Sequence, residues 1–171
     1  MKVIAMFVVA FIAMYIDMAF ATFSPLNIFG LTVYFVPRVL LILVLLLSIY
    51  INQRMGLFTA IVFGLMLDIY IGSIYGIHLF GLAAAVVFMH TAFRVFYKDF
   101  IALAFVILVL TFFYDIYVFI VYRLLEFTSM PVFDYFALRA VPSLLLNAVI
   151  FTAVFFIVLR ISELRDNFKI G

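Results

Sequence analysis

Ionisable side chains stand inside long apolar stretches of this chain: Asp17, Arg38, Asp68, His78 and Asp115. A charge in an apolar environment is costly, so such groups usually pair with one another or mark a path for protons or ions. Asp68 has three possible roles. It could hydrogen-bond backbone amides freed at a turn, pair with a buried Arg or His, or bind a cation or a proton during transport.

The spacing of these residues matches no catalytic motif. The sequence contains no Gly-x-Ser-x-Gly elbow, no His-Glu-x-x-His zinc motif around His78 or His90, and no Gly-x-x-x-x-Gly-Lys phosphate loop. Ser73 is separated from His78 by a predicted turn, which gives no reason for a nucleophile–base contact. The absence of cysteine excludes disulfides, thiolate metal sites and cysteine nucleophiles. We therefore predict a protein that is not an enzyme and holds no metal or cofactor.

The composition indicates an integral membrane protein. Of the 171 residues, 71% are hydrophobic and 11% are charged, whereas a soluble domain is nearer half apolar and a quarter charged. The apolar residues form runs of about 20, the length at which a helix crosses the hydrocarbon layer. The net charge of +2 is spread over the loops, and no basic block indicates nucleic-acid binding. The N-terminal run lacks an A-x-A-like cleavage site, so we assign it to the first span instead of a signal peptide.

The hydropathy pattern predicts an all-α fold, a polytopic membrane protein built as a compact bundle of six transmembrane helices. We find no linker, low-complexity segment or internal repeat, so residues 1–171 are expected to form a single integral membrane domain. The longest connection is "EFTSMPVFDYF" at 126–136, where Pro131 is expected to end any helix. The expected spans are residues 3–23, 31–50, 57–71, 74–93, 100–125 and 138–159.

The basic residues predict the orientation of the bundle. With six spans both termini share one side, and that side holds seven of the ten Lys and Arg residues: Lys2, Arg54, Arg94, Lys98, Arg160, Arg165 and Lys169. The opposite side holds Arg38, Arg123 and Arg139. Because Lys and Arg accumulate in cytoplasmic loops, both termini are expected in the cytoplasm.

Glycines are concentrated in and around the third and fourth spans, at Gly56, Gly64, Gly72, Gly76 and Gly81. Small residues allow membrane helices to approach backbone to backbone. The cluster therefore indicates either tight helix packing inside the protein or a surface for a partner helix. Homodimerisation is left open, because the two glycines with GxxxG spacing, Gly72 and Gly76, are separated by a predicted turn.

Polar groups within the spans are biased toward the side opposite the termini. Asp17 and Arg38 fall at nearly matching depths of an antiparallel hairpin, about 10 Å below its outer boundary by the helical rise. We therefore predict that they form a buried ion pair. His78, Asp115 and Asn147 could line a polar cavity or docking groove that opens outward. Alternatively, these side chains only hold the helices in register.

The run "RMGLFTAIVFGLMLDIYIGSIYGIHLFGLAAA" at 54–85 resembles the rod shape-determining protein MreD family of bacteria. That family shows a span of the form G-x-x-x-G-x-x-x-G-x-x-x-D, followed by G-x-x-x-G and a helix of small residues. The matching positions are Gly56, Gly64, Asp68, Gly72 and Gly76, with Ala60 in place of the middle glycine. The last span, "RAVPSLLLNAVIFTAVFF", is similar to the family's last helix at Pro142, Ser143 and Asn147.

The resemblance implies a multi-pass scaffold or adaptor in the bacterial cytoplasmic (inner) membrane. It implies that the chain binds the bitopic protein MreC and acts with the actin-like MreB and a glycosyltransferase–transpeptidase pair in peptidoglycan synthesis. The outer ends of the third and fourth spans, with the loop at 126–136, are then the expected partner surface. An alternative is the substrate-binding membrane subunit of a vitamin transporter of the energy-coupling-factor type, which would need a pocket with convergent polar groups and an aromatic floor.

Overall fold

The computed structural model describes residues 2–28, 30–71, 74–93 and 100–166, and most of them are helical, as predicted. The elements are α1 (Lys2–Phe23), β1 (Leu26–Ile28), β2 (Leu31–Val33), α2 (Val39–Tyr50), α3 (Gln53–Ile71), α4 (Ile77–Phe93), α5 (Phe100–Leu124), α6 (Val132–Tyr135), a π-helical turn (Phe136–Ala140) and α7 (Val141–Asp166). The two short strands pair in an antiparallel hairpin that the hydropathy pattern does not predict.

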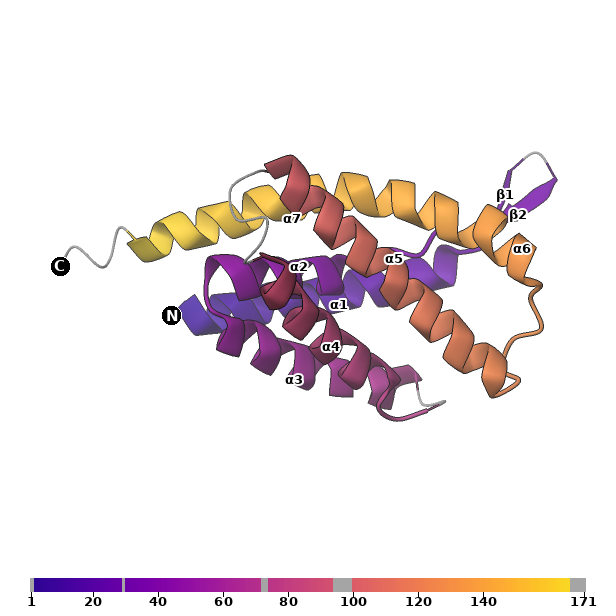
Figure 1. Ribbon diagram of the computed structural model, residues 1–171, viewed down its shortest axis with the longest axis horizontal. Coiled ribbons are helices and arrows are strands. Elements are labelled where there is room, and N and C mark those ends of the chain that lie inside the picture. The colour runs from indigo at the N-terminus through magenta and orange to yellow at the C-terminus, as the bar shows by residue number, and fades with distance from the viewer. Residues whose placement is uncertain (1, 29, 72–73, 94–99, 167–171) are drawn as a thin grey trace.

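Helix α2 is the centre of the bundle. Every side chain from Leu40 to Leu47 is at most 1% exposed, and the helix packs against α1, α3, α4 and α7. Its sequence "VLLILVLLLSIY" is apolar on all faces, the pattern of a helix surrounded by protein. The start of α1 and the end of α7 lie at one end of the bundle, and the β-hairpin and α6 lie at the other (Figure 1).

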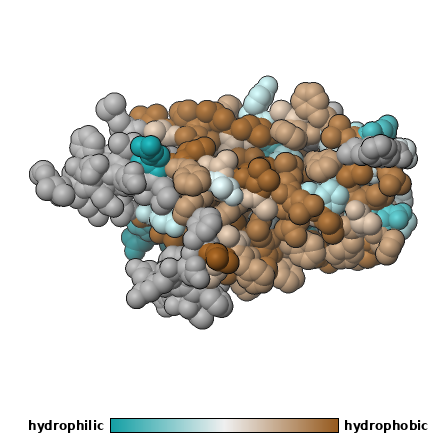
Figure 2. Space-filling view, turned by 90° about the horizontal axis from the view of Figure 1, so that it is seen from above, coloured by the Kyte–Doolittle hydropathy of each residue, from teal (hydrophilic) through white to brown (hydrophobic). Residues whose placement is uncertain are grey.

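The outer side chains suit a hydrocarbon environment. Figure 2 shows an apolar surface across the middle of the visible face, with hydrophilic residues toward both ends. Among the described residues, three helices are long and apolar enough to cross a membrane: Gln53–Ile71, Ile101–Leu124 and the continuous helix Val132–Val158. Within the described part of the chain, three more helices are apolar but shorter: Ile4–Phe20, Val39–Tyr50 and Ile77–Thr91.

The predicted second span is wrong in its first half. Strand β2 covers Leu31–Val33, and the residues that follow, 34–38, here called the extended segment, are neither helix nor strand. Only Val39–Tyr50 are helical. Pro37 has no amide to donate to a helix, and its ring disfavours helical backbone at Val36. The chain therefore enters the bundle in non-helical backbone and becomes a helix only from Val39.

Other helix boundaries also differ from the prediction. Helix α3 begins at Gln53, four residues early, and α4 begins at Ile77, after Gly76 takes up a left-handed φ of +103°. The last helical stretch begins at Val132. Pro131 starts this stretch instead of ending a helix, because the first residues of a helix have no intrahelical acceptor for an amide.

Two glycines allow α3 to touch neighbouring backbone. A Cβ added at Gly64 would lie 2.7 Å from the Cα of Leu79 in α4. A Cβ added at Gly56 would lie 2.5 Å from the Cβ and 2.8 Å from the Cα of Ser48 in α2. Backbone cannot move aside as a flexible side chain can, so these positions admit only glycine at the observed helix separation. Both glycines therefore pack helices within the chain.

Candidate functional site

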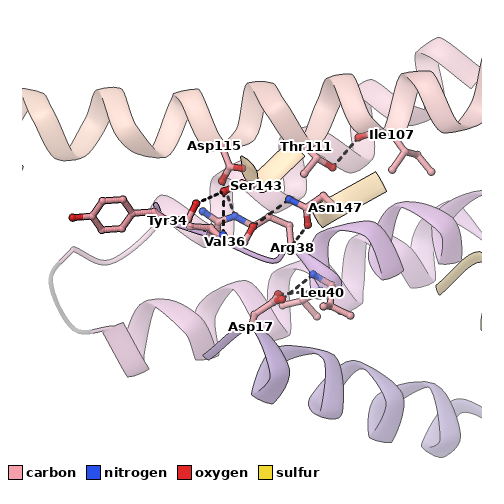
Figure 3. A network of polar contacts seen from close by, with 11 residues as sticks. Asp17, Tyr34, Val36, Arg38, Leu40, Ile107, Thr111, Asp115, Ser143 and Asn147 are labelled. Atoms are coloured by element: carbon pink, nitrogen blue, oxygen red, sulfur yellow. Dashed lines mark hydrogen bonds and ion pairs between the residues drawn. The ribbon is translucent and has the colours of Figure 1, made fainter. Parts of the chain in front are cut away.

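The extended segment forms a polar layer inside the bundle, because side chains of α7 bind its backbone groups (Figure 3). Ser143 Oγ accepts a hydrogen bond from the amide of Val36 at 3.0 Å and donates one to the carbonyl of Tyr34 at 3.3 Å. Asn147 Oδ1 accepts from the amide of Arg38 at 2.8 Å, and its Nδ2 donates to the carbonyl of Val36 at 3.2 Å. Non-helical backbone at membrane depth needs such partners inside the protein.

Asp17 does not pair with Arg38, contrary to the prediction. Its two carboxylate oxygens accept hydrogen bonds from the amides of Val39, at 2.8 Å, and Leu40, at 3.0 Å. These are the first residues of α2, and the first amides of a helix have no acceptor within the helix and attract negative charge. Asp17 of α1 therefore caps α2, which begins inside the bundle.

Arg38 pairs instead with Asp115 of α5. Its Nε lies 2.7 Å from Oδ1 of Asp115, and the two side chains are 13% and 10% exposed. The guanidinium carbon also lies 5.0 Å from the centre of the Tyr114 ring, a cation–π arrangement. Matching depths along two helices could not identify this pair, because Arg38 belongs to the extended segment and helical rise does not set its position.

Asp68 caps the start of α4. Its carboxylate accepts hydrogen bonds from the amides of Gly76 (2.9 Å), His78 (2.9 Å) and Leu79 (3.1 Å). The same carboxylate lies 3.0 Å from Nδ1 of His78, and Asp68 is fully buried. The arrangement corresponds to the first two roles considered for Asp68, binding freed amides and pairing with a histidine. Because Asp68 is buried, it cannot itself contact a partner protein.

The bundle thus uses one structural device twice. An aspartate near the end of α1 caps α2, and an aspartate near the end of α3 caps α4. Both capped helices are among the shorter apolar ones. A helix that starts inside an apolar layer lacks solvent to bind its first amides, so a buried carboxylate from the preceding helix takes that role.

A cavity of about 580 Å³ lies at the end of the bundle opposite the start of α1, between α1, the extended segment, α3, α5 and the π-helical turn. The described lining contains His78 but neither Asp115 nor Asn147, so the predicted trio is not brought together at one cavity. Asp115 is bound to Arg38, and Asn147 to the extended segment. The charged and polar lining residues include Asp17, Tyr34, Arg38, His78, Thr128 and Arg139.

Arg139 is a cavity residue that the sequence does not reveal. It lies in the π-helical turn Phe136–Ala140, and no local pattern in the sequence indicates a turn of that kind. Its guanidinium carbon lies 6.0 Å from the centre of the Tyr135 ring.

Gly72, another predicted site residue, lies outside the described residues. No group of three or more His, Cys, Asp or Glu side chains that could hold a metal ion occurs in the described part of the chain.

Comparison with known proteins agrees with the resemblance seen in the glycine and aspartate pattern. Residues 1–163 match the family model of the rod shape-determining protein MreD. A relative in Bacillus subtilis (strain 168), named rod shape-determining protein MreD, is 26% identical over 137 residues, which cover 77% of this chain and 79% of the relative. No solved structure matches the chain significantly. The chain therefore belongs to the MreD family of rod shape-determining membrane proteins.

Proposed function

We propose that this protein is an adaptor of the bacterial cell-elongation machinery that binds an MreC-like bitopic protein in the inner membrane. The observation that carries the proposal is the family match over residues 1–163. Through this partner the adaptor acts with MreB and the transpeptidase–glycosyltransferase pair to organise peptidoglycan synthesis, and it has no catalytic role of its own. The vitamin-transporter alternative is not favoured by the family match.

The adaptor is proposed to cross the membrane six times as one domain, with both termini in the cytoplasm. The start of α1 and the end of α7 lie at the same end of the bundle (Figure 1), which supports an even number of crossings. The shorter helices cross together with neighbouring non-helical chain, as α2 does with the extended segment. The positive charges near the termini support the cytoplasmic assignment.

The absence of cysteine makes this topology directly testable. Ser129→Cys lies in the exposed connection after α5, and Asn52→Cys lies in the exposed connection between α2 and α3. Three proposed spans separate the two positions, so they should lie on opposite sides. A membrane-impermeant maleimide is expected to label Ser129→Cys in intact spheroplasts and Asn52→Cys only after lysis. The reverse pattern would invert the topology, and equal labelling would change the number of spans.

A groove between α4 and α5 is the proposed site for the transmembrane helix of the partner. Its volume is about 330 Å³, and small residues, Gly81, Ala84 and Ala85, line it together with aromatic side chains. Phe80 and Phe88 are both 68% exposed beside it. Gly81 packs against Tyr114 and Tyr117 of α5 and Ala85 is buried, so Ala84 is the exposed small residue at which a second helix could approach closely, and the exposed rings supply contact area. The groove begins near the outer end of α4, within the region that the family resemblance suggests for the partner.

Ala84→Phe fills this groove and is expected to abolish most co-purification of the MreC-like protein, a loss of roughly 30-fold if the contact is central. Ala84 is exposed, so the fold should tolerate the change. Val87→Phe is the matched control, because Val87 is 50% exposed on the same helix outside the groove. The measurement is partner recovery from native membranes in mild detergent, normalised to the bait. Equal recovery with the two variants would exclude the groove, whereas recovery of no MreC-like protein with the unmodified chain would contradict the proposed function.

A further inference from the structure

The lining of the 580 Å³ cavity combines cationic and apolar side chains. Arg38 and Arg139 supply guanidinium groups, while Leu67, Val118 and Phe119 supply apolar walls. The volume falls within the range of small-molecule sites, roughly 300–1,000 Å³. A ligand that fits this lining must carry an anionic group and an apolar part on one molecule.

Both arginines have hydrogen-bond donors that the described protein leaves unused. Arg38 donates from Nε to Asp115, but its terminal guanidinium nitrogens have no hydrogen-bond partner among the described residues. The Arg139 side chain has neither a hydrogen bond nor an ion pair in the same part of the chain, and its guanidinium carbon lies 6.0 Å from the centre of the Tyr135 ring. Two guanidinium groups with available donors suit a phosphate, which accepts paired hydrogen bonds from Arg.

The acids near the arginines are already engaged. Asp17 also lines the cavity, but both of its oxygens accept from the first amides of α2, whose helix dipole offsets its charge. Asp115 is bound to Arg38. The carboxylates therefore have partners, whereas the guanidinium donors still need an acceptor.

The most exposed residues of the cavity lining have large apolar or aromatic side chains. Tyr70 and Ile71 at the end of α3 are 65% and 40% exposed, and Phe127 after α5 is 57% exposed. A soluble anion would gain nothing from these side chains, but acyl chains leaving the cavity would lie against them. Basic pockets between transmembrane helices are suited to lipid headgroups for this reason.

We infer that this cavity binds the phosphate headgroup of an anionic membrane lipid, with Arg38 and Arg139 as the phosphate ligands and the acyl chains leaving between α3 and the loop after α5. The inference goes beyond the adaptor role and does not depend on it.

Native mass spectrometry of the full chain in non-ionic detergent tests the inference with three probes: phosphatidylglycerol, phosphatidylcholine and inorganic phosphate. The unmodified protein is expected to retain phosphatidylglycerol at least tenfold more strongly than zwitterionic phosphatidylcholine. Arg139→Gln is expected to weaken phosphatidylglycerol binding by roughly tenfold or more, the loss of a charged hydrogen bond. Arg139→Lys keeps the charge and should retain an intermediate affinity.

Arg123→Gln is the matched control, because Arg123 is exposed near the same end of the protein and donates to the carbonyl of Met130 without lining the cavity. This variant should bind phosphatidylglycerol normally. Equal retention of the two lipids by the unmodified protein, or equal losses in Arg139→Gln and Arg123→Gln, would overturn the inference. Displacement of phosphatidylglycerol by inorganic phosphate would assign the site to a soluble anion and also overturn the lipid assignment. The lipid comparison on the unmodified chain decides the matter even if Arg139→Gln does not fold.

Discussion

Asp68→Ala is expected to destabilise the detergent-solubilised protein by about 3–5 kcal/mol, enough to lower its yield and its melting temperature sharply. Asp68 is fully buried and accepts hydrogen bonds from the amides of Gly76, His78 and Leu79. Alanine would leave these three donors and the imidazole of His78 without their acceptor in an apolar interior. The measurement is a thermal unfolding curve followed by circular dichroism.

Two variants show whether the loss comes from the cap. Asp68→Asn keeps one acceptor oxygen and places an NH₂ group against the amide donors, so its loss should be large but smaller than that of Asp68→Ala. Asp134→Ala in α6 is the control, because Asp134 is half-buried and makes no hydrogen bond or ion pair within the described part of the chain. A melting temperature of Asp68→Ala equal to that of Asp134→Ala would show that α4 does not need the carboxylate.

Removing either member of the Arg38–Asp115 pair is expected to cost about 3–5 kcal/mol, and removing both is expected to cost much less than the sum. The two charged atoms lie 2.7 Å apart, and both side chains are largely buried. Asp115→Leu leaves the guanidinium of Arg38 without its counter-charge, and Arg38→Met leaves the carboxylate unpaired. The double variant contains neither orphaned charge and fills similar volume with apolar atoms.

The double-mutant cycle uses the same unfolding measurement on the unmodified protein, the two single variants and the double variant. A coupling free energy of about 1.5 kcal/mol or more would support a direct pair. Additive effects would contradict it. Asp17→Ala provides a useful comparison, since Asp17 was the partner expected for Arg38 but binds the amides of Val39 and Leu40 instead. Its coupling to Arg38→Met should be smaller than the coupling between Arg38 and Asp115, because Asp17 makes no ion pair with Arg38.

The caps of α2 and α4 and the contacts of the extended segment share a physical origin. The amides at the starts of α2 and α4, and the backbone of the extended segment, lie where the bundle is apolar and lack water as a partner. The carboxylates of Asp17 and Asp68 and the side chains of Ser143 and Asn147 supply the missing partners. In the part of the chain that the structure describes, polar side chains therefore bind backbone groups at least as often as they bind one another.

The sequence by itself determined the class of the protein. Hydropathy is a local property that follows from composition over about 20 residues, so an all-helical membrane protein could be predicted from it. Family membership could also be predicted, because Gly56, Gly64 and Asp68 repeat at helical spacing in a recognisable pattern. The same spacing places Gly64 and Asp68 one turn apart on α3, and both meet the start of α4.

Only the tertiary structure decided which polar groups meet. The predicted Asp17–Arg38 pair assumed two helices of matching depth, but the backbone around Pro37 is not helical, and Arg38 reaches Asp115. The cavity likewise depends on the π-helical turn that carries Arg139. Hydropathy and spacing describe position along an element, whereas contacts depend on the direction in which each element crosses its neighbours. That direction is set by packing among residues far apart in the sequence, which no local pattern contains.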